Sequence, residues 1–296
     1  MRVFVTGATG FVGSTVVREL VDAGHQVIGL ARSDAGAKSL TDAGAEVHRG
    51  DFVDLESLRT GAAKSDAVIH TAFIHDFSKF AENSEIERPA LEAIGSALVG
   101  SDRPLIVTSG LALLAKGRAA TEEDPPVPVS ASYPRASEAT AASLEALGVR
   151  TAVVRLPQVH DTVKQGLITY AIHVAREKGI SAYVGEGRNR WAAAHRLDVA
   201  RLYRLALEKN AAGARYHAVA EEGVPARDIA EAIGRGLNVP VVSIAPEETA
   251  GHFGWLGAFV GMDLLASSAQ TRERLGWKPT GPTLLTDLGN MRYSQS

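Results

Sequence analysis

The stretch TGATGFVG, residues Thr6 to Gly13, lies between a short apolar run and a helical pattern. Arg2–Thr6 has the composition of a strand, and Ser14–Ala23 that of a helix ending at Gly24. Glycines at such a junction permit a tight turn and a close approach of the backbone to a pyrophosphate, and the helix N-terminus offers free N–H groups to that anion. The loop therefore predicts dinucleotide binding, with the candidate residues Thr6, Gly7, Thr9, Gly10, Phe11, Val12 and Gly13.

Beyond this loop, short β-branched runs alternate with helical patterns. The further predicted strands are Gln26–Ala31, Glu46–Arg49, Ala67–Thr71, Pro104–Thr108 and Thr151–Arg155, and the helices between them are Ala35–Ala43, Leu55–Ala63, Glu85–Leu98 and Pro134–Leu147. Apolar strands separated by helices indicate a parallel sheet covered on both faces. We expect an α/β fold with a doubly wound parallel sheet of the Rossmann type in residues 1–156. A smaller C-terminal lobe, 157–296, is mainly substrate-binding, and segments within 192–220 return to the sheet.

Composition excludes several classes of protein. The 296 residues include 31 Lys+Arg, 34 Asp+Glu and no cysteine, and 45% are hydrophobic. This balance argues against disorder and gives no global charge to hold nucleic acid or an anionic membrane. Without cysteine there is no disulfide, thiolate metal site or cysteine nucleophile, and no histidine spacing matches a metal site. Gly7 interrupts the first apolar run, so we expect neither a signal peptide nor a membrane span, and a cytoplasmic location.

Several further motifs accompany the glycine loop: Gly50-Asp51, His70-Thr71-Ala72, Thr108-Ser109, Arg155-Leu156-Pro157, His195–Ala200 and Leu275–Pro279. Together they resemble the extended and atypical short-chain dehydrogenase/reductases, which include NAD(P)-dependent epimerases, dehydratases and reductases. The resemblance implies that Asp51 and Phe52 contact adenine, that Thr71 and Ala72 lie along the cofactor, and that Pro157 flanks the nicotinamide. In the alternative interpretation, Asp51 only caps the following helix.

The end of the second predicted strand bears on the choice of nicotinamide cofactor. The segment there is Leu30-Ala31-Arg32-Ser33-Asp34, with an arginine where an NAD-binding enzyme places an acid for the ribose 2′-hydroxyl. Arg32 can contact a 2′-phosphate, and Ser33 with Lys38 can add donors. This pattern favours NADP. NAD is the alternative if Arg32 is only solvated and Asp34 accepts a hydrogen bond from the ribose 2′-hydroxyl.

The resemblance also implies a catalytic Ser, Tyr and Lys. Ser109 matches the serine and Tyr133 the tyrosine, but Ser137 stands in the lysine position. Pro134 moreover disfavours helical geometry at Tyr133. Arg135 lies two positions after Tyr133, so in a regular helix it is not on the same face as the tyrosine. It can take over the role of the lysine only if the turn is irregular.

Other side chains offer alternatives. His75 and His160 follow the loops that the resemblance brings toward the nicotinamide, and histidine exchanges protons near neutrality. Arg190 is a candidate for an anionic substrate group and Trp191 for an apolar wall, although Trp191 can equally be core. His195 and Asp198 are expected to make a structural network, and the apolar cluster His252, Phe253, Trp255, Phe259 and Met262 to cap the pocket or pack a partner.

The leading hypothesis is an NADP-dependent oxidoreductase that reduces a ketone or aldehyde of a small organic substrate. One alternative is a nucleotide-sugar epimerase or dehydratase, which needs an effective base. Another is a non-catalytic NAD(P)-binding sensor. A homodimer through the helices 85–98 and 134–147 is also expected, because the resemblance implies such a bundle.

Overall fold

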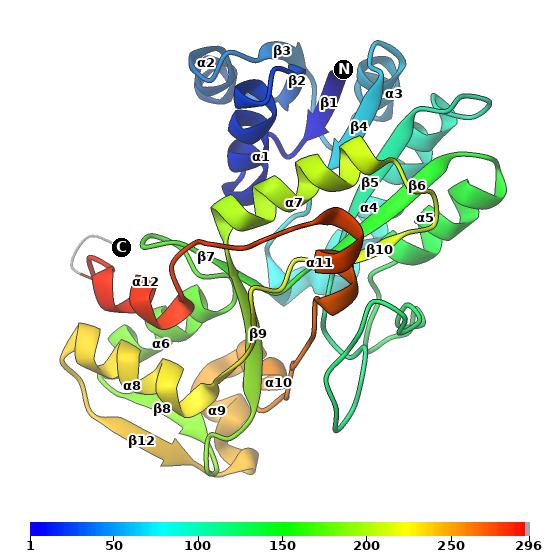
Figure 1. Ribbon diagram of the computed structural model, residues 1–296. Helices are drawn as coiled ribbons and strands as arrows, with labels where there is room; N and C mark the ends of the chain where they lie inside the picture. Colours follow the sequence, from blue (N-terminus) through cyan, green and yellow to red (C-terminus); the bar gives the residue numbers. More distant parts are fainter. Residues whose placement is uncertain (294–296) are drawn as a thin grey trace.

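A seven-stranded parallel sheet combines six strands from the first 156 residues with one strand from later in the chain (Figure 1). The computed structural model describes residues 1–293. The strand order is β10-β6-β5-β4-β1-β2-β3, with every neighbouring pair parallel. The strands are β1 Arg2–Thr6, β2 Gln26–Ala31, β3 Glu46–Arg49, β4 Ala67–His70, β5 Pro104–Gly110, β6 Arg150–Leu156 and β10 Arg215–His217. The order reverses at β1, so the expected α/β doubly wound Rossmann sheet is confirmed.

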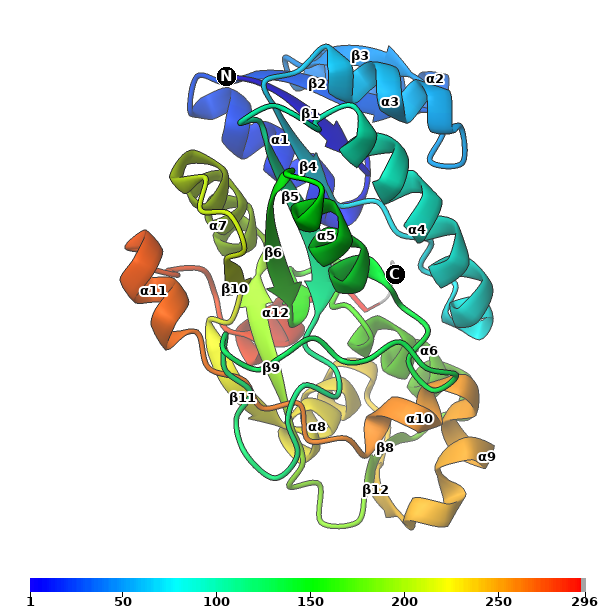
Figure 2. The ribbon, with the colours of Figure 1, turned by 90° about the vertical axis from the view of Figure 1, so that its right-hand side faces the viewer.

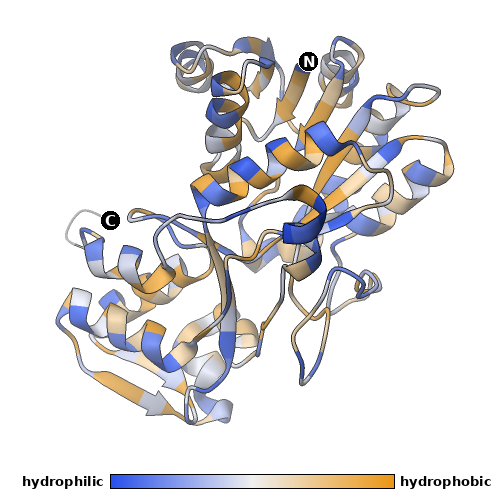
Figure 3. Cartoon of the chain, viewed as in Figure 1, coloured by the Kyte–Doolittle hydropathy of each residue, from blue (hydrophilic) through white to orange (hydrophobic). Residues whose placement is uncertain are grey.

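Helices cover both faces of this sheet, because its strands are apolar on both sides (Figures 2 and 3). One face packs against α1 Phe11–Asp22, α2 Asp34–Asp42 and α7 Arg196–Lys209. The other face packs against α3 Leu55–Ala63, α4 Phe80–Ser96 and α5 Ser137–Ala146. The two hydrophobic clusters that result fix the sheet and leave the ends of its strands to carry the loops.

The C-terminal lobe contains two small sheets and a group of helices. One sheet has the order β11-β9-β7 and the other pairs β12 with β8. Their bounds are β7 Gln158–His160, β8 Ser181–Val184, β9 Arg190–His195, β11 Glu221–Pro225 and β12 Val241–Ile244. Its helices are α6 Ile168–Lys178, α8 Ala226–Leu237, α9 Thr249–Phe253, α10 Gly257–Val260 and α12 Leu284–Asn290, with 3₁₀ turns at Pro246–Glu248 and Gly254–Leu256. The helix α11 Ala269–Leu275 packs instead on α7 and β10, and a further 3₁₀ turn, Phe77–Lys79, precedes α4.

The chain crosses between the two parts more than once. After β9 it enters α7, which packs on α1, and β10 then pairs with β6 at the edge of the main sheet. No helix within the described residues is long and apolar enough to cross a bilayer.

One predicted helix begins later than its pattern indicates. The predicted helix Pro134–Leu147 starts at Ser137, and the residues before it are irregular. Two constraints explain the delay: Pro134 disfavours helical geometry at Tyr133, and Arg135 turns inward to a buried carboxylate. This irregular entry decides the geometry of the candidate site.

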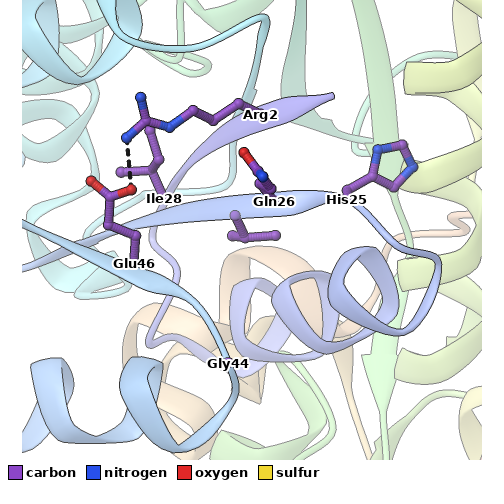
Figure 4. A pocket seen from close by; sticks show the side chains of 7 residues that line it. Arg2, His25, Gln26, Ile28, Gly44 and Glu46 are labelled. Atoms are coloured by element: carbon purple, nitrogen blue, oxygen red, sulfur yellow. Dashed lines mark hydrogen bonds and ion pairs between the residues drawn. The ribbon is translucent and has the colours of Figure 1, made fainter.

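A hollow of about 450 Å³ lies at the amino-terminal edge of the sheet, at the starts of β1, β2 and β3 (Figure 4). Arg2, His25, Gln26 and Glu46 line it, and Arg2 pairs there with Glu46 at 2.6 Å. Ligands of doubly wound sheets bind at the carboxyl ends of the strands. The hollow is therefore on the wrong edge to hold the dinucleotide.

Candidate active site

The glycine loop after β1 leaves no space for side chains at two positions. Gly7 has φ +66°, and a Cβ there would lie 2.7 Å from the backbone nitrogen of Ala72. A Cβ on Gly13 would lie 2.1 Å from the carbonyl oxygen of Gly7. Gly10 caps α1 without a side-chain hydrogen bond, so the first amides of this helix remain available to an anion. The loop thus has the close packing and free donors that a pyrophosphate requires, with Thr9 exposed beside it and Phe11 and Val12 in the first turn of α1.

A buried hydrogen-bond network ties this loop to the end of β4. The Thr6 hydroxyl lies 2.8 Å from Nδ1 of His70, and the Thr71 hydroxyl donates to the carbonyl of Thr6 at 2.8 Å. Burial, with the Arg135 charge, lowers the pKa of His70 to about 3. The imidazole is therefore neutral, and the network holds Thr71 and Ala72 against the glycine loop without adding charge.

Arg32 and Asp51 lie together at the carboxyl edge, beside the first residues of α2. The Arg32 side chain is 81% exposed and its guanidinium is 4.0 Å from the Asp51 carboxylate. Asp34 pairs instead with Arg49 at 2.5 Å. A cation thus remains open to solvent at the end of β2, while the nearby acid is engaged.

The remaining residues predicted at the adenosine end have local partners. Ser33 caps α2 by accepting from the Gly36 amide, and Lys38 pairs with Asp42 along the exposed side of α2. The alternative role for Asp51 as a helix cap is wrong, because Asp54 caps α3 by accepting from the Ser57 amide.

Phe52 and Pro157 lie at the same edge of the sheet as the glycine loop. The Phe52 ring lies 5.6 Å from the His70 ring, at the carboxyl edge of the sheet. Pro157 joins β6 to β7 and is half-buried there. Both residues therefore occupy the edge on which the glycine loop opens.

Ser109 and Tyr133 come together at the end of β5. Ser109 is 2% exposed in the last part of the strand, and Tyr133 lies in the loop before α5 rather than within a helix. Burial raises the pKa of the Tyr133 phenol, whereas the Arg135 cation and a hydrogen bond with Ser109 oppose the rise. The phenol is therefore held in its protonated form next to the Ser109 hydroxyl, so both groups can hydrogen-bond to one carbonyl oxygen.

Arg135 approaches this pair because its segment is not helical. Its guanidinium donates to both carboxylate oxygens of Glu87, at 2.8 and 3.1 Å, and to the carbonyl of Thr108 at 3.1 Å. It also stacks 4.5 Å from the centre of the Phe73 ring. Glu87 is fully buried on α4, so the ion pair fixes a cation beneath the active-site loop.

Sequence reasoning missed Glu87, although its position carried a signal. It precedes Ala90, Leu91 and Ile94 at the helical spacing of an apolar face, where a carboxylate needs a buried partner. Tyr203 was also missed: its hydroxyl lies 2.6 Å from that of Thr108 and burial raises its pKa. Tyr203 comes from α7, far away in the sequence, and no local pattern marks it.

His160 belongs to a different cluster. It is fully buried, with Nδ1 2.7 Å from Asp287 of α12 and Nε2 3.8 Å from Glu221. His195 lies 3.8 Å from the same Asp287 carboxylate. The cluster joins β7 and β9 to the C-terminal helix, so the structure corrects the role expected for His160: its ring packs inside the lobe instead of facing a substrate.

Asp198 also acts structurally. Its carboxylate accepts from the amides of Thr280 and Gly281, at 2.9 and 2.7 Å, and its carbonyl accepts from the Trp277 indole. These bonds hold the segment Leu275–Pro279 on α7, as expected of a structural network. In the described part of the chain, no group of three or more His, Asp or Glu side chains could bind a metal.

The predicted substrate residues are separated. His75 is exposed but crowded by the rings of Phe73 and Phe77, and this crowding, with nearby cations, lowers its pKa. Arg190 is neutralised by Asp263, at 3.0 Å. Trp191 is 4% exposed and packs in the lobe core, which agrees with the alternative expectation, and it also lines a small apolar cavity there.

Comparison with known proteins agrees with this geometry. The model of the NAD dependent epimerase/dehydratase family matches residues 3–220. An uncharacterized protein of Schizosaccharomyces pombe is 47% identical over 99% of this chain and 100% of its own. A 4-hydroxy-2-methyl-3-oxo-4-farnesyl-3,4-dihydroquinoline-1-oxide ketoreductase of Stigmatella aurantiaca is 28% identical over 73% of this chain and 67% of its own.

The fold is shared with a solved structure. The UDP-glucose 4-epimerase of Thermus thermophilus in complex with NAD superposes with a TM-score of 0.75 over 100% of both chains, at 19% identity. The family match covers the whole Rossmann sheet, including the glycine loop and the Ser109–Tyr133 pair. The chain therefore belongs to the NAD-dependent epimerase/dehydratase family.

Proposed function

We propose that this protein is an NADP-dependent oxidoreductase that reduces the carbonyl group of a small ketone or aldehyde. The observation that carries the proposal is the Tyr133 phenol, held protonated beside Ser109 at the carboxyl edge of the sheet. A protonated phenol is the form that a reductase needs, because reduction ends with a proton on the substrate oxygen. An epimerase or dehydratase starts by removing a proton, which requires the opposite form.

The chain's own groups would divide the work as follows. A reduced nicotinamide dinucleotide, when bound, supplies the hydride. Ser109 orients the carbonyl oxygen, and Tyr133 donates a proton to it. Arg135 places a fixed positive charge near the phenol, which stabilises the tyrosinate left after that transfer. Arg135 would thus replace, through the irregular loop, the lysine for which this chain has Ser137.

The test of this chemistry is oxidation of NADPH in the presence of a panel of aldehydes, ketones and nucleotide sugars. Tyr133→Phe keeps the ring and removes the donor, so kcat should fall about 10²–10⁴-fold. Ser109→Ala should lower kcat as well, whereas Tyr183→Phe, at a half-buried tyrosine of the C-terminal lobe, serves as the control. Tight cofactor binding without turnover of any carbonyl would favour the sensor instead.

The preference for NADP rests on Arg32. A charged hydrogen bond to a 2′-phosphate is worth about 1.5–3 kcal/mol, so Arg32→Ser should weaken NADPH binding roughly 10–100-fold and leave NADH binding nearly unchanged. Fluorescence titration with both dinucleotides measures this. If wild-type protein binds NADH tenfold more tightly than NADPH, the assignment of NADP is wrong. A cytoplasmic location and a homodimer remain predictions.

A further inference from the structure

Six aromatic rings from two parts of the chain form a continuous surface beside Tyr133. We name this surface the aromatic wall. Its members are Phe73, Phe77, Phe80, Tyr170, Trp255 and Phe259. The first three follow β4 and lead into α4, and the last three lie on α6, the 3₁₀ turn Gly254–Leu256 and α10. Figure 2 shows the start of α4 directed toward this part of the C-terminal lobe.

The wall reaches the proposed proton donor directly. The ring of Phe80 is 6.4 Å from that of Tyr133 and 5.8 Å from that of Phe77. Phe77 in turn stacks on Trp255, with centroids 5.5 Å apart and planes at 19°. A molecule with its carbonyl at Tyr133 therefore extends along aromatic faces.

The rings of the wall are only half-buried, unlike the packed aromatic side chains of the lobe core. Of the three tryptophans, Trp191 and Trp277 are buried and Trp255 keeps an exposed face. Contiguous, partly exposed aromatic surface of this kind marks a binding site. It adjoins the candidate active site, so its occupant is the substrate.

The polar groups at the wall offer little to a phosphate. Arg135, which stacks on Phe73, is held by Glu87, and Arg190 is paired with Asp263. The Tyr170 hydroxyl donates to the carbonyl of His75 at 2.9 Å, and Lys79 points to solvent. Among these side chains only Lys79 offers a solvent-exposed cation, whereas the two phosphates of a nucleoside diphosphate carry more charge than one lysine can neutralise.

We infer that the substrate is an aromatic carbonyl compound, whose ring packs on Phe77 and Trp255 while its oxygen meets Ser109 and Tyr133. This inference rests on the proposed reductase function and specifies the substrate of the same site. Aromatic rings pair in stacked or edge-on geometry more favourably than aliphatic groups of the same area. A planar ring is accordingly preferred over a saturated ring of equal size.

Two measurements test it. The first compares kcat/KM for benzaldehyde, cyclohexanecarbaldehyde and UDP-glucose with NADPH; we expect benzaldehyde to exceed the saturated aldehyde roughly tenfold. The second follows quenching of tryptophan fluorescence by 4-nitrobenzyl alcohol, which binds without turnover. Trp255→Leu should abolish the saturable part of this quenching, because the two buried tryptophans are shielded.

Variants distinguish the loss of ring contacts at the aromatic wall from a general loss of stability. Phe77→Leu and Trp255→Leu, with their melting temperatures recorded, should each reduce the benzaldehyde preference severalfold. Tyr183→Leu, a half-buried aromatic of the same lobe outside the wall, should keep the wild-type preference. A preference that survives both wall variants would overturn the inference.

The outcomes also distinguish this inference from the proposed function. Quenching that depends on Trp255, without turnover of any carbonyl, would leave the aromatic site and reject the reductase. Turnover without quenching, equal rates for the two aldehydes, or preferred turnover of UDP-glucose would reject the aromatic substrate. Absence of both quenching and turnover would reject both.

Discussion

The buried ion pair between Glu87 and Arg135 provides the sharpest test of how the active-site loop is held. The Glu87 side chain is 1% exposed and that of Arg135 13%, and two hydrogen bonds join them. Removing one partner of a buried pair leaves an unpaired charge and costs about 3–5 kcal/mol. Glu87→Gln keeps the shape and one acceptor, so we expect a loss near 3 kcal/mol and a melting temperature about 6–12 °C lower.

A matched surface pair serves as the control. Arg188 and Glu186 are also 2.8 Å apart, but their side chains are 84% and 72% exposed. Exposed pairs contribute about 0–1 kcal/mol, so Glu186→Gln should change the unfolding free energy by less than about 1 kcal/mol. The two variants differ mainly in burial, which isolates the physical cause.

Urea unfolding followed by circular dichroism measures the loss, and a double-mutant cycle identifies the interaction. Replacement of both partners, Glu87→Leu with Arg135→Met, removes both charges and should cost less than either single replacement. If Glu87→Gln costs no more than Glu186→Gln, or if the two single losses add in the double variant, the ion pair does not hold the loop.

Three further predictions concern the glycine loop, a buried histidine and the proposed proton donor. Gly13→Ala places a Cβ against the Gly7 carbonyl and should destabilise the fold by about 1–3 kcal/mol while removing the thermal shift given by NADPH. Gly289→Ala, in the open on α12, should be neutral or slightly stabilising. The pKa of His70, about 3 in the folded state, implies that the unfolded chain takes up a proton first as pH falls below about 6.5. This residue should therefore lower the unfolding free energy by about 2 kcal/mol between pH 7 and pH 5. The drop should be smaller in His70→Asn and the same as in the wild type in the exposed variant His173→Asn. Urea midpoints at both pH values measure it. Burial raises the pKa of Tyr133, and in the proposed mechanism the protonated phenol is the active form. We therefore expect kcat for carbonyl reduction to stay level to about pH 9 and to fall only above the usual range of a phenol pKa. A fall centred near pH 7 in the pH–rate profile would contradict this.

The dinucleotide half of the molecule was predictable because its signals are local. The spacing of Gly7, Gly10 and Gly13 follows from a turn between one strand and the next helix, and apolar strands alternating with helices specify a covered parallel sheet. Strand boundaries such as Gln26–Ala31 agree for the same reason. The exposed cation at Arg32 likewise depends only on its place at a strand end.

The geometry of the candidate active site required the tertiary structure. In the sequence, Arg135 looks too close to Tyr133 to share a face with it, and Glu87 is 48 residues away. Only the packing of α4 against the loop before α5 brings them together and holds that loop out of a helix. The same holds for the aromatic wall, since Phe77 and Trp255 meet across two parts of the chain. Local periodicity determines the helices, the strands and their turns. Contacts between distant elements depend on the free energy of burying charges and rings against one another, and no single stretch of sequence contains that information.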